Sequence, residues 1–98
     1  MQGKSIYKVP NGKLIKVFLR HFANRIDLVQ FTGDFFIHPE ESITTLEQSL
    51  VGTELDANEI VKIVKDVKGK NNLTFFGIDE AAIATAILMA KDNIVEVK

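Results

Sequence analysis

The side chains that could carry acid–base chemistry or hold a metal ion are few in this chain, and their spacing suits neither task. The two histidines, His21 and His38, lie far apart and belong to no recognisable metal-binding motif. Glu40 and Glu41 are adjacent, and neighbouring side chains at the start of a helix point in different directions. The positive end of a helix dipole explains these carboxylates better than an acid/base pair does. We therefore expect no metal site and no catalytic residue in this chain.

Other kinds of chemistry are excluded or disfavoured by composition. The chain has no cysteine, which excludes disulfides, thiolate metal sites, iron–sulfur ligation and a cysteine nucleophile. Pro10–Lys13 contains a Gly-Lys pair, but no phosphate-binding glycine pattern surrounds it, and a hairpin turn explains the segment. An autonomous small enzyme is the least favoured function, and we expect the chain alone to bind no cofactor.

Charge is distributed unevenly along the sequence. Residues 1–37 carry six Lys or Arg against two Asp, whereas residues 38–98 carry six Lys against eleven acids. The basic residues, interleaved with Tyr7, Phe18 and Phe22, are Lys4, Lys8, Lys13, Lys16, Arg20 and Arg25. Such a surface suits nucleic acid or an acidic protein. Because the net charge of the whole chain is −1, we expect no nucleic-acid partner.

Length and composition are typical of one globular domain spanning residues 1–98. The chain is 46% hydrophobic and 26% charged, as soluble folded proteins are. No apolar run reaches the roughly 18 to 20 residues that span a bilayer, and the first residues lack the apolar stretch of a secretory signal. We expect a cytoplasmic protein with no membrane partner.

The first third of the chain predicts strands. Two runs of mostly alternating apolar residues, Lys13–Phe22 and Arg25–Phe35, indicate a strand pair. Ala23-Asn24 between them suits a tight hairpin, because Asn tolerates a positive φ. An earlier segment, Ile6–Val9, ends at the turn signal Pro10-Asn11-Gly12 and predicts a third strand.

The rest of the chain predicts helices. The expected helices run from Pro39 to a stop at Gly52, from a capping box at Asp56 and Glu59 to about Gly69, and onward from Asp79. Leu73–Phe76 is either a fourth short strand or a buried linker. The predicted fold class is therefore α+β, with an antiparallel three-stranded sheet and about three helices packed against it.

The most distinctive segment is the corner from Gly33 to Glu41. Asp34 is expected to be partly buried, where it either accepts backbone N–H bonds or fixes the loop for an interface. Phe35 and Phe36 form a hot-spot pair if exposed and a part of the core if not. His38 is expected to be a cap or packing residue, with partner contact as the alternative, and His21 a structural or solvent-facing residue.

Four motifs stand out along the chain: Asn11–Val17, Thr32–Phe36, Pro39–Glu41 and the helical pattern formed by Ile43, Leu46, Glu47, Leu50 and Gly52. Together they resemble the carboxy-terminal accessory domain of lipoate–protein ligases, above all the archaeal type in which this domain is a separate small subunit. They keep the family's order and gaps from about Lys8 to Lys91. The resemblance also implies a fold similar to the SufE/NifU-like scaffold and sulfur-acceptor proteins of iron–sulfur assembly, although the absence of cysteine excludes sulfur transfer.

The resemblance implies a noncatalytic accessory subunit of a two-component lipoate–protein ligase, with a large catalytic subunit as its partner. The family makes lipoyl-adenylate from lipoate and ATP, and then transfers lipoate to a lysine of a lipoyl domain or of the glycine-cleavage H protein. The small domain serves mainly the adenylation step, while ATP and lipoate, with Mg, bind the catalytic partner. We expect a partner interface centred on Asp34, Phe35, Phe36, His38 and Glu40.

An alternative function is a free-standing protein-binding module that presents acidic lipoyl carrier domains. Such a module would bind its carriers through Lys4, Lys16 and Arg20 on the basic strands. Salt separates the two functions, because carrier capture through charges weakens steeply with salt, whereas an apolar subunit contact holds.

Overall fold

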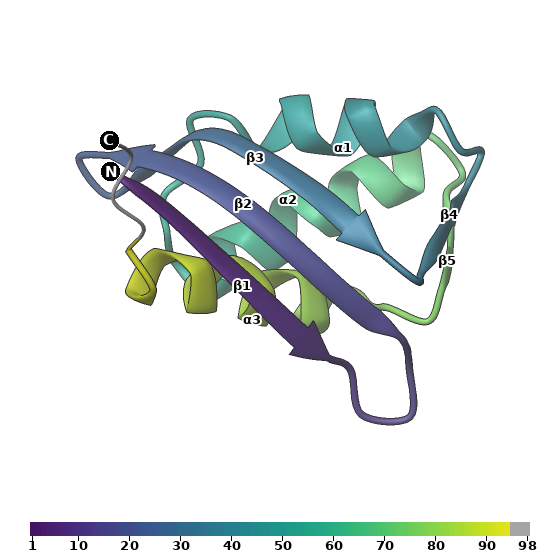
Figure 1. The fold of residues 1–98 in the computed structure, drawn as a ribbon. Helices are drawn as coiled ribbons and strands as arrows, with labels where there is room; N and C mark the ends of the chain where they lie inside the picture. The colour runs from purple at the N-terminus through teal and green to yellow at the C-terminus, as the bar shows by residue number, and fades with distance from the viewer. Residues whose placement is uncertain (95–98) are drawn as a thin grey trace.

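The computed structural model describes residues 1–94, which fold into a three-stranded sheet, three helices and a small two-stranded sheet (Figure 1). In chain order the elements are β1 (Gln2–Lys8), β2 (Leu14–Phe22), β3 (Arg25–Gly33), β4 (Phe36–His38), α1 (Ser42–Leu50), α2 (Ala57–Lys70), β5 (Thr74–Phe76) and α3 (Glu80–Asp92). The expected α+β class, with its three-stranded antiparallel sheet and three helices, is confirmed. None of the helices within residues 1–94 is long and apolar enough to cross a membrane.

The main sheet has the order β1-β2-β3, and all three helices lie on one of its faces (Figure 1). Alternate residues of β2, namely Ile15, Val17 and Leu19, are buried toward the helices. α3 packs against β1 and β2, α1 packs against β3, and α2 packs against the other two helices. The opposite face of the sheet is left without a covering element among residues 1–94.

β1 is longer than predicted because it lies close to α3. It begins at Gln2, whereas the sequence indicated a strand from Ile6. Ala86 and Ala90 of α3 are buried, and the hydroxyl of Ser5 donates a hydrogen bond to the carbonyl oxygen of Ala86 at 2.6 Å. A Cβ atom on Gly3 would overlap the carbonyl oxygen of Ala90. The contact between β1 and α3 is therefore built from small residues. Because the first residues of β1 are not large and apolar, the apolar pattern of the sequence did not indicate the start of this strand.

The two edges of the main sheet are occupied by the chain itself. On the β3 side, Ile26 exchanges hydrogen bonds with the loop after α1, at 2.9 Å to the Thr53 oxygen and 2.7 Å from the Gly52 N–H. Farther along, the Phe31 N–H donates to the Glu47 carboxylate of α1 at 2.8 Å. On the β1 side, the backbone of Lys4 bonds to Asn93 through both its N–H, at 3.2 Å, and its oxygen, at 2.8 Å.

The predicted cap of α2 at Asp56 is confirmed, and α3, which was expected to begin at Asp79, is capped by that residue. The carboxylate of Asp56 accepts a hydrogen bond from the Glu59 N–H at 3.1 Å, and that of Asp79 accepts one from the Ala82 N–H at 2.7 Å. α2 ends at Lys70, one residue beyond the predicted stop.

The predicted start of α1 at Pro39 is wrong, because the helix begins at Ser42. Residues 39–41 form a tighter turn in which the Ser42 N–H bonds to the Pro39 oxygen at 3.0 Å and the Ile43 N–H to the Glu40 oxygen at 3.3 Å. This turn satisfies the first N–H groups of the helix without a side-chain cap.

The corner before α1 is also organised differently from the prediction. β3 ends at Gly33, which has φ of +141°, and the chain bends at Asp34 before entering a separate strand, β4. β4 pairs with β5, so Leu73–Phe76 contributes a short strand, but one outside the main sheet. The expected continuation of β3 to Phe35 is therefore wrong, because a glycine in this conformation turns the chain out of the sheet.

Candidate functional site

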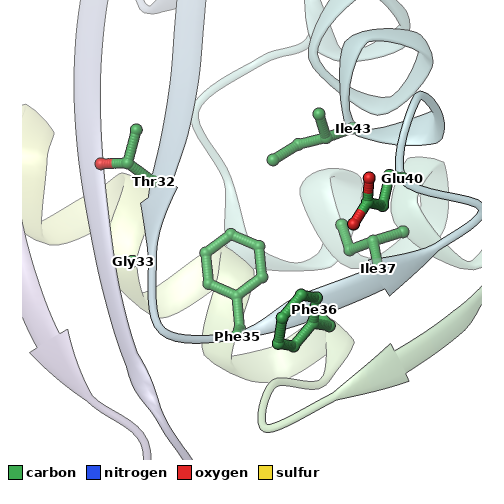
Figure 2. A pocket seen from close by; sticks show the side chains of 7 residues that line it. All are labelled: Thr32, Gly33, Phe35, Phe36, Ile37, Glu40 and Ile43. Atoms are coloured by element: carbon green, nitrogen blue, oxygen red, sulfur yellow. The ribbon is translucent and has the colours of Figure 1, made fainter.

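A hollow of about 160 Å³ lies where β3 leaves the main sheet and the chain turns into β4 (Figure 2). It is lined by Thr32, Gly33, Phe35, Phe36, Ile37, Glu40 and Ile43. Three of the five predicted interface residues, Phe35, Phe36 and Glu40, thus come together at this hollow. The other two, Asp34 and His38, are their neighbours in the chain.

The two adjacent phenylalanines have opposite environments. Phe35 is 8% exposed and belongs to the core, whereas Phe36 is 61% exposed. Figure 2 shows the Phe35 ring standing in the space between Thr32 and Ile43, with Phe36 projecting separately from β4. Successive residues of an extended chain point to opposite sides, which explains the split. Phe36 is therefore the member of the pair that a partner can reach.

Phe36 has an aromatic neighbour that the sequence analysis missed. In the β4–β5 pairing Phe36 lies directly opposite Phe76, which is 54% exposed. Side chains of directly paired residues lie on the same face, so the two rings are side by side. His38 and Thr74 form the next pair on that face, and both are exposed. We call the face formed by Phe36, His38, Thr74 and Phe76 the β4–β5 outer face.

The opposite face of the β4–β5 pair anchors it to the body of the protein. Ile37 is buried, and Phe75, its partner across the strands, is half-buried against the core. The Lys68 ammonium of α2 lies 4.9 Å from the centroid of the Phe75 ring and 3.3 Å from the Glu80 carboxylate of α3. Lys68 thereby joins β5 to α2 and is itself paired with α3, and these contacts support the outer face from the opposite side.

Glu80 is electrostatically adapted to this anchoring role. A hydrogen bond from its own backbone N–H lowers the pKa of its carboxyl most, and the charge and hydrogen bond of Lys68 lower it further, while burial acts in the opposite direction. Glu80 therefore stays ionised and paired with Lys68.

The remaining predicted site residues are all exposed. The expected partial burial of Asp34 is wrong, and so is the first of its two expected roles, because within residues 1–94 its carboxylate accepts no hydrogen bond. Its own N–H donates to the Leu14 oxygen at 3.0 Å. The second expected role, fixing the loop for an interface, stays a prediction. The bend after Gly33 turns this side chain into solvent. His38 is exposed in β4 and caps no helix, so the expected cap or packing role is also wrong. Glu40 lies at the rim of the hollow, near Ile37 (Figure 2).

His21 lies outside this site and has a structural environment. Its side chain is 7% exposed, and Nε2 is buried without a hydrogen-bond partner in the part of the chain that the structure describes. Burial lowers the pKa of its imidazole most, and the positive charges of the amino terminus and Lys91 add to the effect. Of the two predicted environments, structural and solvent-facing, the structural one is confirmed.

The fold and the motifs at its corner define the class of protein. Residues 7–87 match the family model described as the C-terminus of bacterial lipoate protein ligase. The chain therefore belongs to the family of lipoate protein ligase C-terminal domains, and the resemblance read from its motifs is confirmed. The further likeness to iron–sulfur scaffold proteins stays a prediction.

Two relatives place the chain within this family more narrowly. It is 38% identical, over 68 residues that make up 69% of each chain, to lipoate-protein ligase A subunit 2 from Thermoplasma acidophilum. It also resembles, with a TM-score of 0.76 and 30% identity, a chain from the structural analysis of an archaeal lipoylation system, a bi-partite lipoate protein ligase and its E2 lipoyl domain from the same organism. That match covers 89% of this chain and 94% of the other.

Proposed function

We propose that this chain is the noncatalytic accessory subunit of a two-component lipoate–protein ligase. The observation that carries the proposal is the structural match over nearly the full length of a chain from a bi-partite ligase. The curated relative, named as a ligase subunit, supports the same assignment. Both relatives favour this function over a free-standing carrier-binding module.

The accessory role concerns the activation of lipoate. The carboxylate of lipoate attacks the α-phosphorus of ATP, which forms lipoyl-adenylate and releases pyrophosphate. ATP, lipoate and Mg²⁺ bind the catalytic subunit in this proposal; within residues 1–94 no group of three or more His, Asp or Glu side chains is arranged to hold a metal ion. The small subunit acts by closing over the catalytic site or ordering its loops, which excludes water from the reactive adenylate.

The contact with the catalytic subunit is proposed to use the β4–β5 outer face. Phe36 and Phe76 are large, exposed and adjacent, and aromatic residues of this kind dominate interface energies once a partner buries them. Glu40 lines the same hollow as Phe36, and Asp34 lies two residues before Phe36 in the chain, so both would form a charged rim on the Phe36 side of this pair. Ile37 and Phe75 pack against the core and hold the two strands in place. The face therefore has its binding conformation before the partner arrives, which lowers the entropic cost of association.

The proposal is tested by measuring ATP- and lipoate-dependent release of pyrophosphate by the large subunit from the same organism, with and without this chain. We expect adenylation to require the small chain. The double variant Phe36→Ala/Phe76→Ala should bind the large subunit at least about 30-fold more weakly, because a hot-spot residue contributes about 2 kcal/mol or more. Full adenylation by the large subunit alone would contradict the accessory role.

A matched control shows whether weaker binding comes from the loss of the proposed interface or from the loss of any exposed aromatic side chain. Phe22 is 80% exposed and lies at the far end of β2, in the hairpin with β3. Phe22→Ala should bind the large subunit as the unaltered chain does. Equal weakening by Phe22→Ala would move the interface away from the β4–β5 outer face while leaving the accessory function intact.

A further inference from the structure

The face of the main sheet that points away from the helices is a second exposed surface (Figure 1). Its centre is formed by two cross-strand pairs of β1 and β2: Ile6 lies opposite Lys16, and Lys4 lies opposite Phe18. Ile6 is 63% exposed, and Phe18 is half-buried. We call the surface formed by Lys4, Ile6, Lys16 and Phe18 the open sheet face.

Apolar and cationic side chains alternate on this face. Because each apolar residue is paired with a lysine, Ile6 and Phe18 lie on one diagonal of the surface, and Lys4 and Lys16 lie on the other. A shallow hollow of about 280 Å³ lies among these residues and reaches Thr32 of β3. A partner docked here would bury apolar area and meet two ammonium groups at the same time.

The charge of the sheet selects an acidic partner. Asp27 is the only acidic residue in β1, β2 and β3, and it is engaged with Arg20, whose Nε lies 2.6 Å from the Asp27 carboxylate. Within residues 1–94 neither Lys4 nor Lys16 makes an ion pair. Among the described residues no carboxylate cancels the positive field of these two lysines, and this field would attract an acidic surface.

The open sheet face is continuous with the proposed contact for the catalytic subunit. Thr32 at the end of β3 lines both the hollow of the open sheet face and the hollow beside Phe36. A protein seated on the open sheet face would consequently lie next to the catalytic subunit. The acceptor of lipoate must occupy such a position, because its lysine has to reach the lipoyl-adenylate.

We propose that the open sheet face docks an acidic surface of the protein that accepts lipoate, so that this subunit recruits the acceptor as well as assisting adenylation. The inference rests on the proposed function. Nucleic-acid binding is dominated by cationic contacts to phosphates, whereas two of the four residues of the open sheet face are apolar. The exposed Ile6 and half-buried Phe18 between them suit the surface of a folded protein.

The test compares two double variants in the reconstituted ligase. Lys4→Glu/Lys16→Glu reverses the charge of the open sheet face, and Lys62→Glu/Lys65→Glu makes the same change at exposed positions of α2. The acceptor probe is the lipoyl domain of an oxo-acid dehydrogenase E2 component. For the sheet variant we expect the KM for this domain in lipoate transfer to rise about tenfold, with kcat, pyrophosphate release and binding to the catalytic subunit unchanged. The α2 variant should leave all four quantities unchanged.

The alternative outcomes each overturn the proposal in a recognisable way. If the sheet variant loses binding to the catalytic subunit, the open sheet face belongs to the subunit contact. An unchanged KM, or an equal rise for the α2 variant, would show that this face does not recruit the acceptor. Retention of a nucleic-acid oligomer by the unaltered chain, lost in the sheet variant, would assign the face to nucleic acid. Failure of the proposed function itself is separate, because it would appear as adenylation that does not need this chain.

Discussion

At the scale of single residues, His21 links burial to pH dependence. In the folded chain its pKa is lowered from the ordinary value of 6.5, so the folded state resists protonation that the unfolded state accepts. Above pH 6.5, the pKa of the unfolded state, His21 is neutral in both states and costs the folded state nothing. As the pH falls below 6.5 toward the lower pKa of the folded state, the unfolded state gains the proton first, and the folded state loses stability relative to it. We therefore expect the free energy of unfolding, measured by urea denaturation, to decrease as the pH is lowered from 7.5 to 5.5.

The variant His21→Leu should lose this part of the pH dependence. It also removes the buried Nε2 atom that has no partner among residues 1–94, so its stability at pH 7.5 should not suffer for lack of a hydrogen bond. His38→Gln, at an exposed position, serves as the control and should retain the slope. An unchanged slope in His21→Leu would assign the acid sensitivity to other groups.

Residue types predicted the location of the candidate site better than they predicted the exposure of its members. The sequence marked Phe35 and Phe36 as a pair but left open whether they were core or surface. That choice depends on which side of the extended chain meets α1, and this is a property of packing. Phe76 was missed because its link to Phe36 is a pairing between distant strands. The repeat of a Phe-Phe dipeptide at 75–76 was the available signal.

At the scale of elements, the contact between β1 and α3 sets a steric limit. Gly3→Ala would place a methyl group against the carbonyl oxygen of Ala90, and backbone atoms cannot move aside as a flexible side chain can. We expect a loss of about 1 to 3 kcal/mol in the free energy of unfolding, as overpacked cores show. Gly69→Ala in α2 is the matched control, because no heavy atom lies within 4 Å of its new Cβ, and it should stabilise the helix by about 0.5 to 1 kcal/mol.

Chemical denaturation of both glycine variants measures these effects. Equal stability of Gly3→Ala and the unaltered chain would show that β1 and α3 can separate at little cost.

Elements with strong local signals were predicted, and those built by distant contacts were not. β2, the hairpin to β3 and the caps of α2 and α3 follow from alternation, Asn24 and the two capping aspartates. The first residues of β1 are small or polar, since α3 supplies the apolar surface there. β4 and β5 have three residues each, too few for a pattern, and exist because they pair with each other.

At the scale of the whole molecule, the two proposed surfaces differ in chemistry and should differ in their response to salt. The β4–β5 outer face presents aromatic rings, whereas the open sheet face presents the exposed ammonium groups of Lys4 and Lys16. Raising the salt from about 50 mM to about 500 mM should change the affinity for the catalytic subunit little and raise the KM for the acceptor domain, because screening acts on exposed charges. Calorimetry of the subunits and transfer kinetics measure the two responses. A steep salt dependence of subunit binding would contradict an apolar contact.

The occupied edges of the main sheet have a consequence for the protein before it meets any partner. Exposed strand edges are templates on which other chains can add a strand, and this is a common route to aggregation. Here the Gly52-Thr53 loop and Glu47 occupy the β3 edge, and Asn93 occupies part of the β1 edge. Because these backbone groups are already hydrogen-bonded within the chain, two copies of the protein cannot join edge to edge at those positions. Partners are thereby left to bind at the two proposed surfaces, the β4–β5 outer face and the open sheet face.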